Sequence, residues 1–141
     1  MIKKVRIPTL KADSYRRSYF KHQTPVAPSA SSEEQYFEIN NRCVWPNVID
    51  AHRLEFYMIF IMTRGEGIYT FGPTELYIRE NTLCFIGPDM IRSWRAQMDE
   101  QQGFFVNFSE TFFSQGFMNR RMLHDFPFFQ VGGHPVIQLS E

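Results

Sequence analysis

The chain has 141 residues, which is the size of one globular domain with a single hydrophobic core. Its 15 Lys and Arg balance 15 Asp and Glu, so the formal net charge at pH 7 is zero. Proteins that bind nucleic acid through its phosphates carry an excess of positive charge. The composition therefore argues against direct DNA binding by this chain.

The cysteines and the longest apolar run bear on the cellular compartment. Cys43 and Cys84 show no CxxC spacing, which is typical of buried thiols in a reducing compartment. Pro8 and charged residues follow the basic N-terminus, where a secretory signal has an apolar core. The longest apolar run, residues 56–63, is far shorter than the roughly 20 residues that span a bilayer. We therefore expect a cytoplasmic protein without a membrane segment.

Residues 1–35 are polar and include a Pro- and Ser-rich stretch over residues 24–32. Such a composition is typical of a flexible arm and linker. Tyr15, Tyr19 and Phe20 are candidates to dock on the folded body, although a solvated arm is the simpler expectation. The sequence thus predicts an N-terminal arm ahead of the main domain.

From residue 36 the sequence changes to short β-rich runs separated by Gly, Pro and Asn, residues that favour turns. Runs at such regular spacing predict an antiparallel barrel or sandwich over residues 36–109. The expected strands span residues 36–39, 53–63, 67–71, 75–78, 83–86, 92–96 and 103–108.

The apolar spacing becomes helical after Phe108. Ser109 followed by Glu110 resembles a helix N-cap with an acid in the first turn. Apolar residues then recur at helical spacing, which predicts a helix over residues 110–123 that covers the barrel. These apolar residues are Phe112, Phe113, Phe117 and Met118.

The end of the sequence is interpreted as a connection to another domain. Residues 135–139 are strand-like and follow a Gly pair, and residues 140–141 resemble the start of a helix. We therefore expect residues 110–141 to form a helix and a terminal strand that lead to a C-terminal domain.

Five segments, in their order and spacing, resemble the N-terminal cupin domain of AraC-type transcription regulators. They are residues 52–57, 63–67, 87–94, 108–110 and 126–129. The resemblance implies a mostly β fold: a cupin-like antiparallel barrel or jelly roll with a C-terminal helix and a flexible N-terminal arm. It also implies a homodimer that senses a small-molecule effector, and a separate C-terminal helix-turn-helix domain that binds DNA.

Metal-binding cupins use two histidines two residues apart, a glutamate further along, and a histidine from a second motif. The resemblance places these ligand positions at His52, Leu54, Met58 and Arg92. Residues two apart on a strand point to the same side. Because Leu, Met and Arg are unsuited to zinc, iron or manganese in such a site, we expect no metal and no other cofactor.

Strand alternation also defines a candidate ligand-binding set on the inward face of the barrel. One strand contributes His52, Leu54, Met58 and Phe60, and another contributes Arg92 and Trp94. Within this set an arginine suits a carboxylate, a tryptophan suits a sugar or aromatic ring, and a histidine suits a hydrogen bond. In the alternative interpretation the apolar members fill the core and the arginine extends to the barrel mouth.

No nucleophile elbow, phosphate loop or nucleophile beside a base is recognisable, so no catalytic residues are expected and the protein is interpreted as a non-enzyme. The predicted function is effector sensing and dimerisation in an AraC-type regulator. The effector is expected to be a small polar molecule, such as a sugar or an organic acid, in a metal-free pocket. Two alternatives stay open: a metal-free cupin enzyme of the sugar epimerase or isomerase type, and a free-standing small-molecule-binding cupin.

Overall fold

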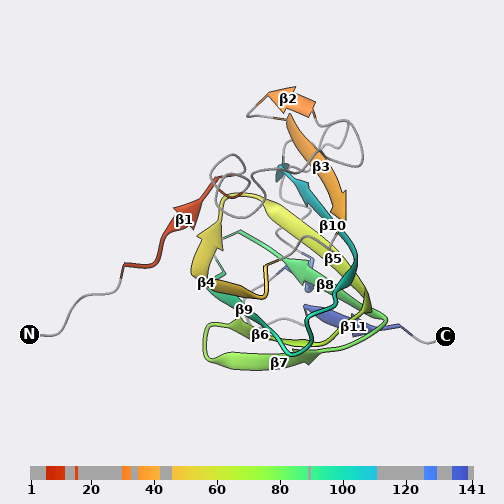
Figure 1. The fold of residues 1–141 in the computed structure, drawn as a ribbon. Coiled ribbons are helices and arrows are strands. Elements are labelled where there is room, and N and C mark those ends of the chain that lie inside the picture. Colours follow the sequence, from red (N-terminus) through yellow and green to blue (C-terminus); the bar gives the residue numbers. More distant parts are fainter. Residues whose placement is uncertain are drawn as a thin grey trace, which may run out of the picture.

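The structure is a computed structural model that describes residues 6–11, 15, 30–32, 35–41, 46–88, 90–110, 126–129 and 135–139. In this part of the chain β-strands dominate, and they form two sheets that face each other (Figure 1). The strands are β1 (Thr9–Leu10), β2 (Ala30–Ser32), β3 (Gln35–Asn41), β4 (Val48–Leu54), β5 (Tyr57–Arg64), β6 (Gly67–Phe71), β7 (Thr74–Ile78), β8 (Thr82–Ile86), β9 (Arg92–Ala96), β10 (Gln102–Phe108) and β11 (Val136–Gln138).

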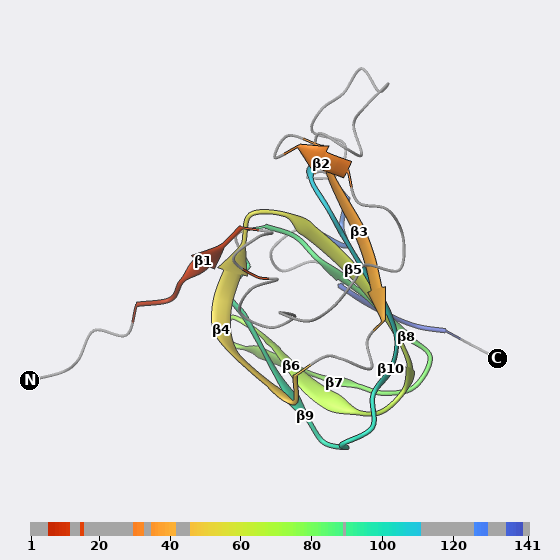
Figure 2. The same ribbon diagram turned by 45° about the horizontal axis from the view of Figure 1, so that its top comes forward.

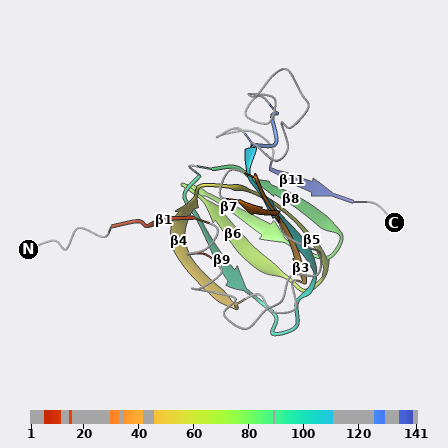
Figure 3. The same cartoon turned by 90° about the horizontal axis from the view of Figure 1, so that it is seen from above.

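The strands divide between a five-stranded sheet, in the order β1-β4-β9-β6-β7, and a six-stranded sheet, in the order β11-β8-β5-β10-β3-β2. Apart from the parallel pair β1 and β4, the pairings are antiparallel. From β4 to β10 the chain passes repeatedly between the two sheets, which close around a common interior (Figure 3). This is the double-sheet architecture of jelly rolls and cupins. The mostly β, cupin-like fold predicted from the sequence is therefore confirmed.

The strand predicted over residues 53–63 is wrong, because the chain bends at Glu55 and Phe56. The strand β4 ends at Leu54 in the five-stranded sheet, and β5 begins at Tyr57 in the six-stranded sheet. Glu55 is exposed and Phe56 is buried, so the alternation of polar and apolar residues continues through the bend. Alternation alone consequently could not reveal where one strand ends and the next begins.

Two predicted features lie wholly or largely outside the described residues. Glu110 is helical, but residues 111–125 of the predicted helix are not described. Cys43 is likewise not described, whereas Cys84 is buried, as predicted. Within residues 1–35, the described parts include β1 and β2.

The hydrophobic core lies between the two sheets. Alternate residues of β5, β6 and β8 point inward, and burial of each large apolar side chain stabilises the fold by about 1.5 to 3 kcal/mol. The buried apolar members of these three strands are Tyr57, Met58, Phe60, Met62, Tyr69, Phe71, Cys84 and Ile86, of which Tyr57 alone faces outward from the barrel.

A second apolar cluster covers the outer face of the six-stranded sheet. Phe129 packs edge-on against Tyr57, with ring centroids 4.9 Å apart, and Phe128 stacks on Phe85 at 4.6 Å. Tyr57 also stacks on Phe108 at 5.6 Å. Residues 126–129 therefore pack against this sheet from the outside, separately from the barrel interior.

The strands β5 and β10 meet closely at the end of the barrel where β10 begins. Gly103 has a φ of +140°, and an added Cβ would lie 1.9 Å from the carbonyl oxygen of Ile61. The pairing register shifts between Gln102 and Gly103, as in a β-bulge. Only glycine suits both this backbone conformation and this close approach.

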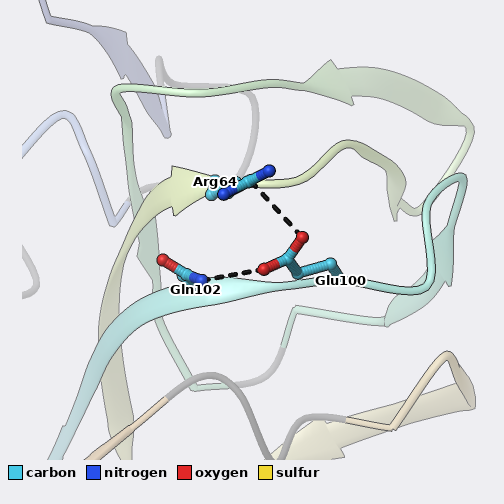
Figure 4. Close-up of polar contacts among 3 residues, drawn as sticks. All are labelled: Arg64, Glu100 and Gln102. Carbon is cyan, nitrogen blue, oxygen red and sulfur yellow. Dashed lines mark hydrogen bonds and ion pairs between the residues drawn. The ribbon is translucent and has the colours of Figure 1, made fainter.

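An exposed polar group joins the same two strands. Glu100 forms an ion pair with Arg64, with Oε2 and Nε 3.4 Å apart, and accepts a hydrogen bond from Gln102 at 2.9 Å (Figure 4). The Arg64 and Glu100 side chains are 56% and 51% exposed. Exposed ion pairs contribute at most about 1 kcal/mol, so the backbone contact at Gly103 is the stronger constraint.

Replacement of this glycine tests that constraint. We expect Gly103→Ala to destabilise the domain by about 2 to 3 kcal/mol, because it adds a backbone clash to an unfavourable φ. In a domain of this size, that corresponds to a melting temperature lowered by roughly 5 to 10 °C. The control is Gly72→Ala, since Gly72 has a φ of +55° and no atom within 4 Å of an added Cβ. Equal losses in both variants, measured by thermal unfolding, would contradict the proposed close approach.

Candidate functional site

The side chain of Arg92 lies inside the barrel. It is the first residue of β9, is 1% exposed, and belongs to the five-stranded sheet. Its Nη1 lies 3.4 Å from Sδ of Met58 on β5, so the side chain reaches across the interior to the opposite sheet. A guanidinium this deeply buried must be hydrogen-bonded, because transfer of an unpartnered charge from water is very costly.

All three guanidinium nitrogens of Arg92 donate hydrogen bonds to neutral side chains. Nε donates to Nε2 of His52 at 3.0 Å, and Nη2 donates to the hydroxyl of Tyr15 at 3.1 Å. Nη1 donates to the hydroxyl of Tyr69 as well as to Met58. Among the described residues, no carboxylate forms an ion pair with this guanidinium. Each nitrogen has at least one acceptor, and four of the five N–H groups are hydrogen-bonded, but no counter-charge contacts the guanidinium in the part of the chain that the structure describes.

Two aromatic rings add to this environment. The Cζ atom of Arg92 lies 5.5 Å from the ring centroid of Tyr15 and 5.6 Å from that of Tyr69. Both distances fall within the range of cation–π attraction, which strengthens when the cation is desolvated. The two tyrosines therefore stabilise the buried cation with both their rings and their hydroxyl oxygens.

A β-bulge directs His52 into the barrel. Ile49 pairs with Trp94 and His52 pairs with Arg92, so β4 advances three residues while β9 advances two. As a result Ile49 and His52 are both buried, although they are three positions apart along β4, a spacing that would place them on opposite faces of a regular strand. The bulge thus re-aims His52 toward the guanidinium.

The partners of His52 define its protonation state. Its Nδ1 lies 2.8 Å from the carbonyl oxygen of Asp50, which can only accept, and its Nε2 faces Arg92, which can only donate. The ring is therefore neutral, with its proton on Nδ1. Burial lowers the pKa of His52 from 6.5 to about 4, helped by the positive charge of Arg92 and opposed by the hydrogen bond to Asp50.

Tyr15 reaches the interior from the segment that precedes the barrel. It is 1% exposed, its ring centroid lies 5.8 Å from that of His52, and its ring meets Phe56 edge-on at 5.6 Å. The solvated position expected for this residue is therefore wrong. Its aromatic ring made Tyr15 a candidate to dock on the folded body, but nothing in the sequence connected it with Arg92 or with the barrel interior.

The short strand β1 holds this segment against the barrel. It runs parallel to the end of β4, with Leu10 paired to Leu54, at the edge of the five-stranded sheet (Figure 2). The carbonyl of Leu10 accepts a hydrogen bond from the Glu55 amide at 3.0 Å, and the Tyr15 amide donates to the Lys11 carbonyl at 2.9 Å. Tyr15 is consequently placed at the barrel end where β4 passes into β5.

All six candidate ligand-binding residues point inward, but not from the strands that were expected. His52 and Leu54 lie on β4, whereas Met58 and Phe60 lie on β5 in the opposite sheet, because of the bend between these strands. His52 and Met58 contact the guanidinium of Arg92 directly. This buried position contradicts the alternative in which the arginine extends to the barrel mouth.

The remaining three candidates belong to the apolar core. Leu54 is fully buried, and Phe60 stacks on Tyr69 with centroids 5.5 Å apart. The Trp94 ring lies over Gly67, where an added Cβ would come within 2.2 Å of it, and its centroid is 5.4 Å from that of Tyr69. These side chains pack behind the polar contacts and hold Tyr69 in place.

Four further interior residues were not identified from the sequence. Tyr69 follows the alternation of Gly67 and Phe71 on β6, a signal that could have placed it inside. Glu38, Asn40 and Asn107 are buried polar residues of β3 and β10. Polar side chains are usually exposed, so these three residues were not expected to face the barrel interior.

The residues around His52 do not form a metal site. Among the described residues, no group of three His, Cys, Asp or Glu side chains is positioned to hold a metal ion. The Nε2 atom of His52 is the ring nitrogen that would bind a metal, but it accepts a hydrogen bond from the cationic side chain of Arg92. A metal at this point would meet the positive charge of Arg92 at close range.

A helix that crosses a membrane must be long and apolar. No helix in the described ranges has the length and apolar character needed to cross a bilayer.

Several solved structures are similar to the chain. A cupin-2 domain containing protein from Shewanella frigidimarina matches with 12% identity and a TM-score of 0.42, over 65% of this chain and 89% of its own. A cupin 2 conserved barrel domain protein from Salinispora arenicola matches with 11% identity and a TM-score of 0.46, over 68% of this chain and 82% of its own. A third, from Rhodopseudomonas palustris, has 18% identity and a TM-score of 0.42, over 62% of this chain and 67% of its own.

A comparison with curated proteins gives no match. The protein-family comparison does give one, and it covers most of the chain. The model of the AraC-like ligand binding domain matches residues 35–138, which include the strands from β3 to β11 and all the barrel residues that contact Arg92. The chain therefore belongs to the family of AraC-like ligand binding domains.

Proposed function

We propose that this chain is the effector-sensing domain of an AraC-type transcription regulator and that it binds a small organic acid inside the barrel. The observation that carries the proposal is the buried guanidinium of Arg92, whose contacts within the described ranges are all with neutral side chains. The family match supports the sensing role. The charge of Arg92 supports the choice of an anion over a neutral sugar.

The neutral partners of Arg92 accept four hydrogen bonds from its five N–H groups without neutralising its charge. A carboxylate would supply both hydrogen-bond acceptors and a counter-charge, and it can engage two guanidinium nitrogens at once. Each hydrogen bond to a charged group contributes about 1.5 to 3 kcal/mol. An anion at this position would therefore bind more strongly than a neutral molecule of the same shape.

Because the guanidinium is buried and each of its nitrogens already contacts a protein side chain, an incoming acid gains room most simply by replacing one partner. His52, Met58 and Tyr69 belong to long barrel strands, whereas Tyr15 follows β1, a strand of two residues. Displacement of Tyr15 disrupts the fewest contacts of the barrel itself. We propose that the acid takes the place of the Tyr15 hydroxyl on Nη2 of Arg92.

The neutral state of His52 is part of this site. Its lone pair on Nε2 holds Nε of Arg92, which leaves Nη2 to bind a ligand once Tyr15 is displaced. Both ring nitrogens are engaged, so His52 is poorly suited to act as a general base. This supports a binding function over the enzyme alternative.

The rest of the proposal concerns the parent protein. We propose a cytoplasmic homodimer in which residues 1–35 are an arm, residues 36–109 form the sensing barrel, and residues 110–141 lead to a DNA-binding helix-turn-helix domain. Binding of the acid would alter the docking of the arm, which supplies Tyr15, and so relay the signal to other parts of the regulator.

The role of Arg92 can be tested with a thermal-shift screen of small carboxylic acids and neutral sugars. We expect an acid to stabilise the wild-type domain and to bind Arg92→Met at least roughly tenfold more weakly, as follows from the loss of a charge-assisted hydrogen bond. Arg95→Met is the matched control, since Arg95 is exposed on the same strand. Equal binding to both variants, or a preference for neutral sugars, would contradict the anion site.

Acidification should weaken the fold through His52. Its pKa lies near 4 in the folded protein and 6.5 when unperturbed, so the unfolded state takes up the proton first. The stabilisation is complete above pH 6.5 and is lost as the pH falls toward 4, with a total of about 3 kcal/mol. Urea unfolding across this range should show a steeper loss for the wild type than for His52→Gln, which does not titrate. Parallel pH profiles would contradict the neutral, buried state of His52.

DNA binding by this chain alone is expected to be weak. The chain has no formal net charge, so the electrostatic attraction that drives non-specific association is missing. In a mobility-shift titration at moderate salt we expect no sequence-specific complex. Specific retention of a duplex at submicromolar protein would contradict the proposal that another domain binds DNA.

A further inference from the structure

Buried polar side chains on the interior face of the six-stranded sheet include three that lie on the neighbouring strands β3 and β10. They are Glu38 and Asn40 of β3 and Asn107 of β10. On such a face the side chains are normally apolar, because a buried polar group costs free energy unless it is hydrogen-bonded. These residues therefore mark a polar part of an otherwise apolar wall.

Within this polar part, the side chain of Asn107 has an unsatisfied acceptor. Asn107 is 3% exposed, and its Oδ1 atom has no hydrogen-bond partner in the portion of the chain that the structure describes. Thr82 provides a contrast on the same face of the sheet, because its hydroxyl donates to Gln138 at 3.0 Å. Buried acceptors without a partner are rare and costly, so Asn107 requires an explanation.

The ladder places Asn107 beside the contacts of Arg92. Asn107 pairs with Met58 on β5, and Sδ of Met58 lies 3.4 Å from Nη1 of Arg92. Because neighbouring strands lie about 4.8 Å apart, the amide of Asn107 is within roughly 5 to 10 Å of the guanidinium. Both groups face the interior, and Met58, which lies between them, is a flexible side chain that adapts its shape readily.

Both groups also lie at one end of the barrel. Met58 is the second residue of β5 and His52 lies near the end of β4, so the register places their partners Asn107 and Arg92 next to the β4–β5 connection. Tyr15 enters the interior at this same end. A small molecule that replaces Tyr15 on Arg92 therefore comes within reach of Asn107.

We infer that Asn107 is a second contact for the same ligand, and that the ligand is a small acid that also carries a hydroxyl or an amino group. Arg92 can only donate hydrogen bonds, and Oδ1 of Asn107 can only accept them. A ligand that satisfies both must have an anionic group at one end and a hydrogen-bond donor roughly 5 to 10 Å away. This inference rests on the proposed binding of an acid at Arg92, and it narrows the class of acid.

The test compares matched straight-chain acids of about three to six carbons, each with and without a terminal hydroxyl or amino group. Binding to the wild type, Asn107→Leu, Asn107→Asp and the control Thr82→Val is measured by thermal shift. We expect a hydroxy or amino acid to bind the wild type at least about tenfold more tightly than its unsubstituted parent. Asn107→Leu should reduce this preference to less than about twofold.

The free proteins give a second readout that needs no ligand. Asn107→Leu should raise the melting temperature, because it removes a buried oxygen that has no partner among the described residues. Thr82→Val should lower it, because it breaks a hydrogen bond, and should leave the ligand preference unchanged. Asn107→Asp keeps an oxygen acceptor, so it should retain the preference for a donor group.

The outcomes separate this inference from the proposed function. If acids bind in an Arg92-dependent way but the unsubstituted parents bind equally well, the contact at Asn107 is wrong and the anion site stands. The same conclusion follows if Asn107→Leu keeps the preference or lowers the melting temperature. If no acid binds the wild type, the anion site fails and the inference fails with it.

Discussion

The guanidinium of Arg92 is the group on which the organisation of this barrel depends. It lies in the interior, where an ion costs several kcal/mol relative to water, and it is retained only because every nitrogen finds an acceptor. Those acceptors come from β4, β5 and β6 and from the segment ahead of the barrel. One side chain thus links both sheets and the N-terminal segment at one end of the fold.

This arrangement divides the interior into two parts. At the β4–β5 end lie the polar side chains, among them Arg92, His52 and Asn107. The remaining interior is filled by apolar and aromatic packing, including Phe60 and Trp94, which holds the sheets together. In the proposed function, recognition is therefore assigned to the polar end and stability mainly to the apolar packing, a division that is typical of binding sites.

Much of the fold and part of the site follow from the sequence. Alternation places Arg92, Trp94 and Met58 inward, because side chains on a strand point to opposite faces in turn. The same alternation continues through the bend at residues 55–56, so it hides the change of sheet. Tyr15 and Asn107 were not identified as site residues for other reasons. A tyrosine in a polar segment and an asparagine on a strand give no local signal that they contact a buried arginine. Their positions depend on contacts between distant segments, which a single sequence does not specify.

In the proposed binding mode, an acid replaces the Tyr15 hydroxyl on the guanidinium of Arg92. An experimental structure of the domain with a bound acid tests it most directly, since both groups are then visible together. The expected result is an acid oxygen within hydrogen-bond distance of Nη2 of Arg92, with the Tyr15 side chain moved away. An acid bound elsewhere on the domain, with the Tyr15–Arg92 contact intact, would contradict it.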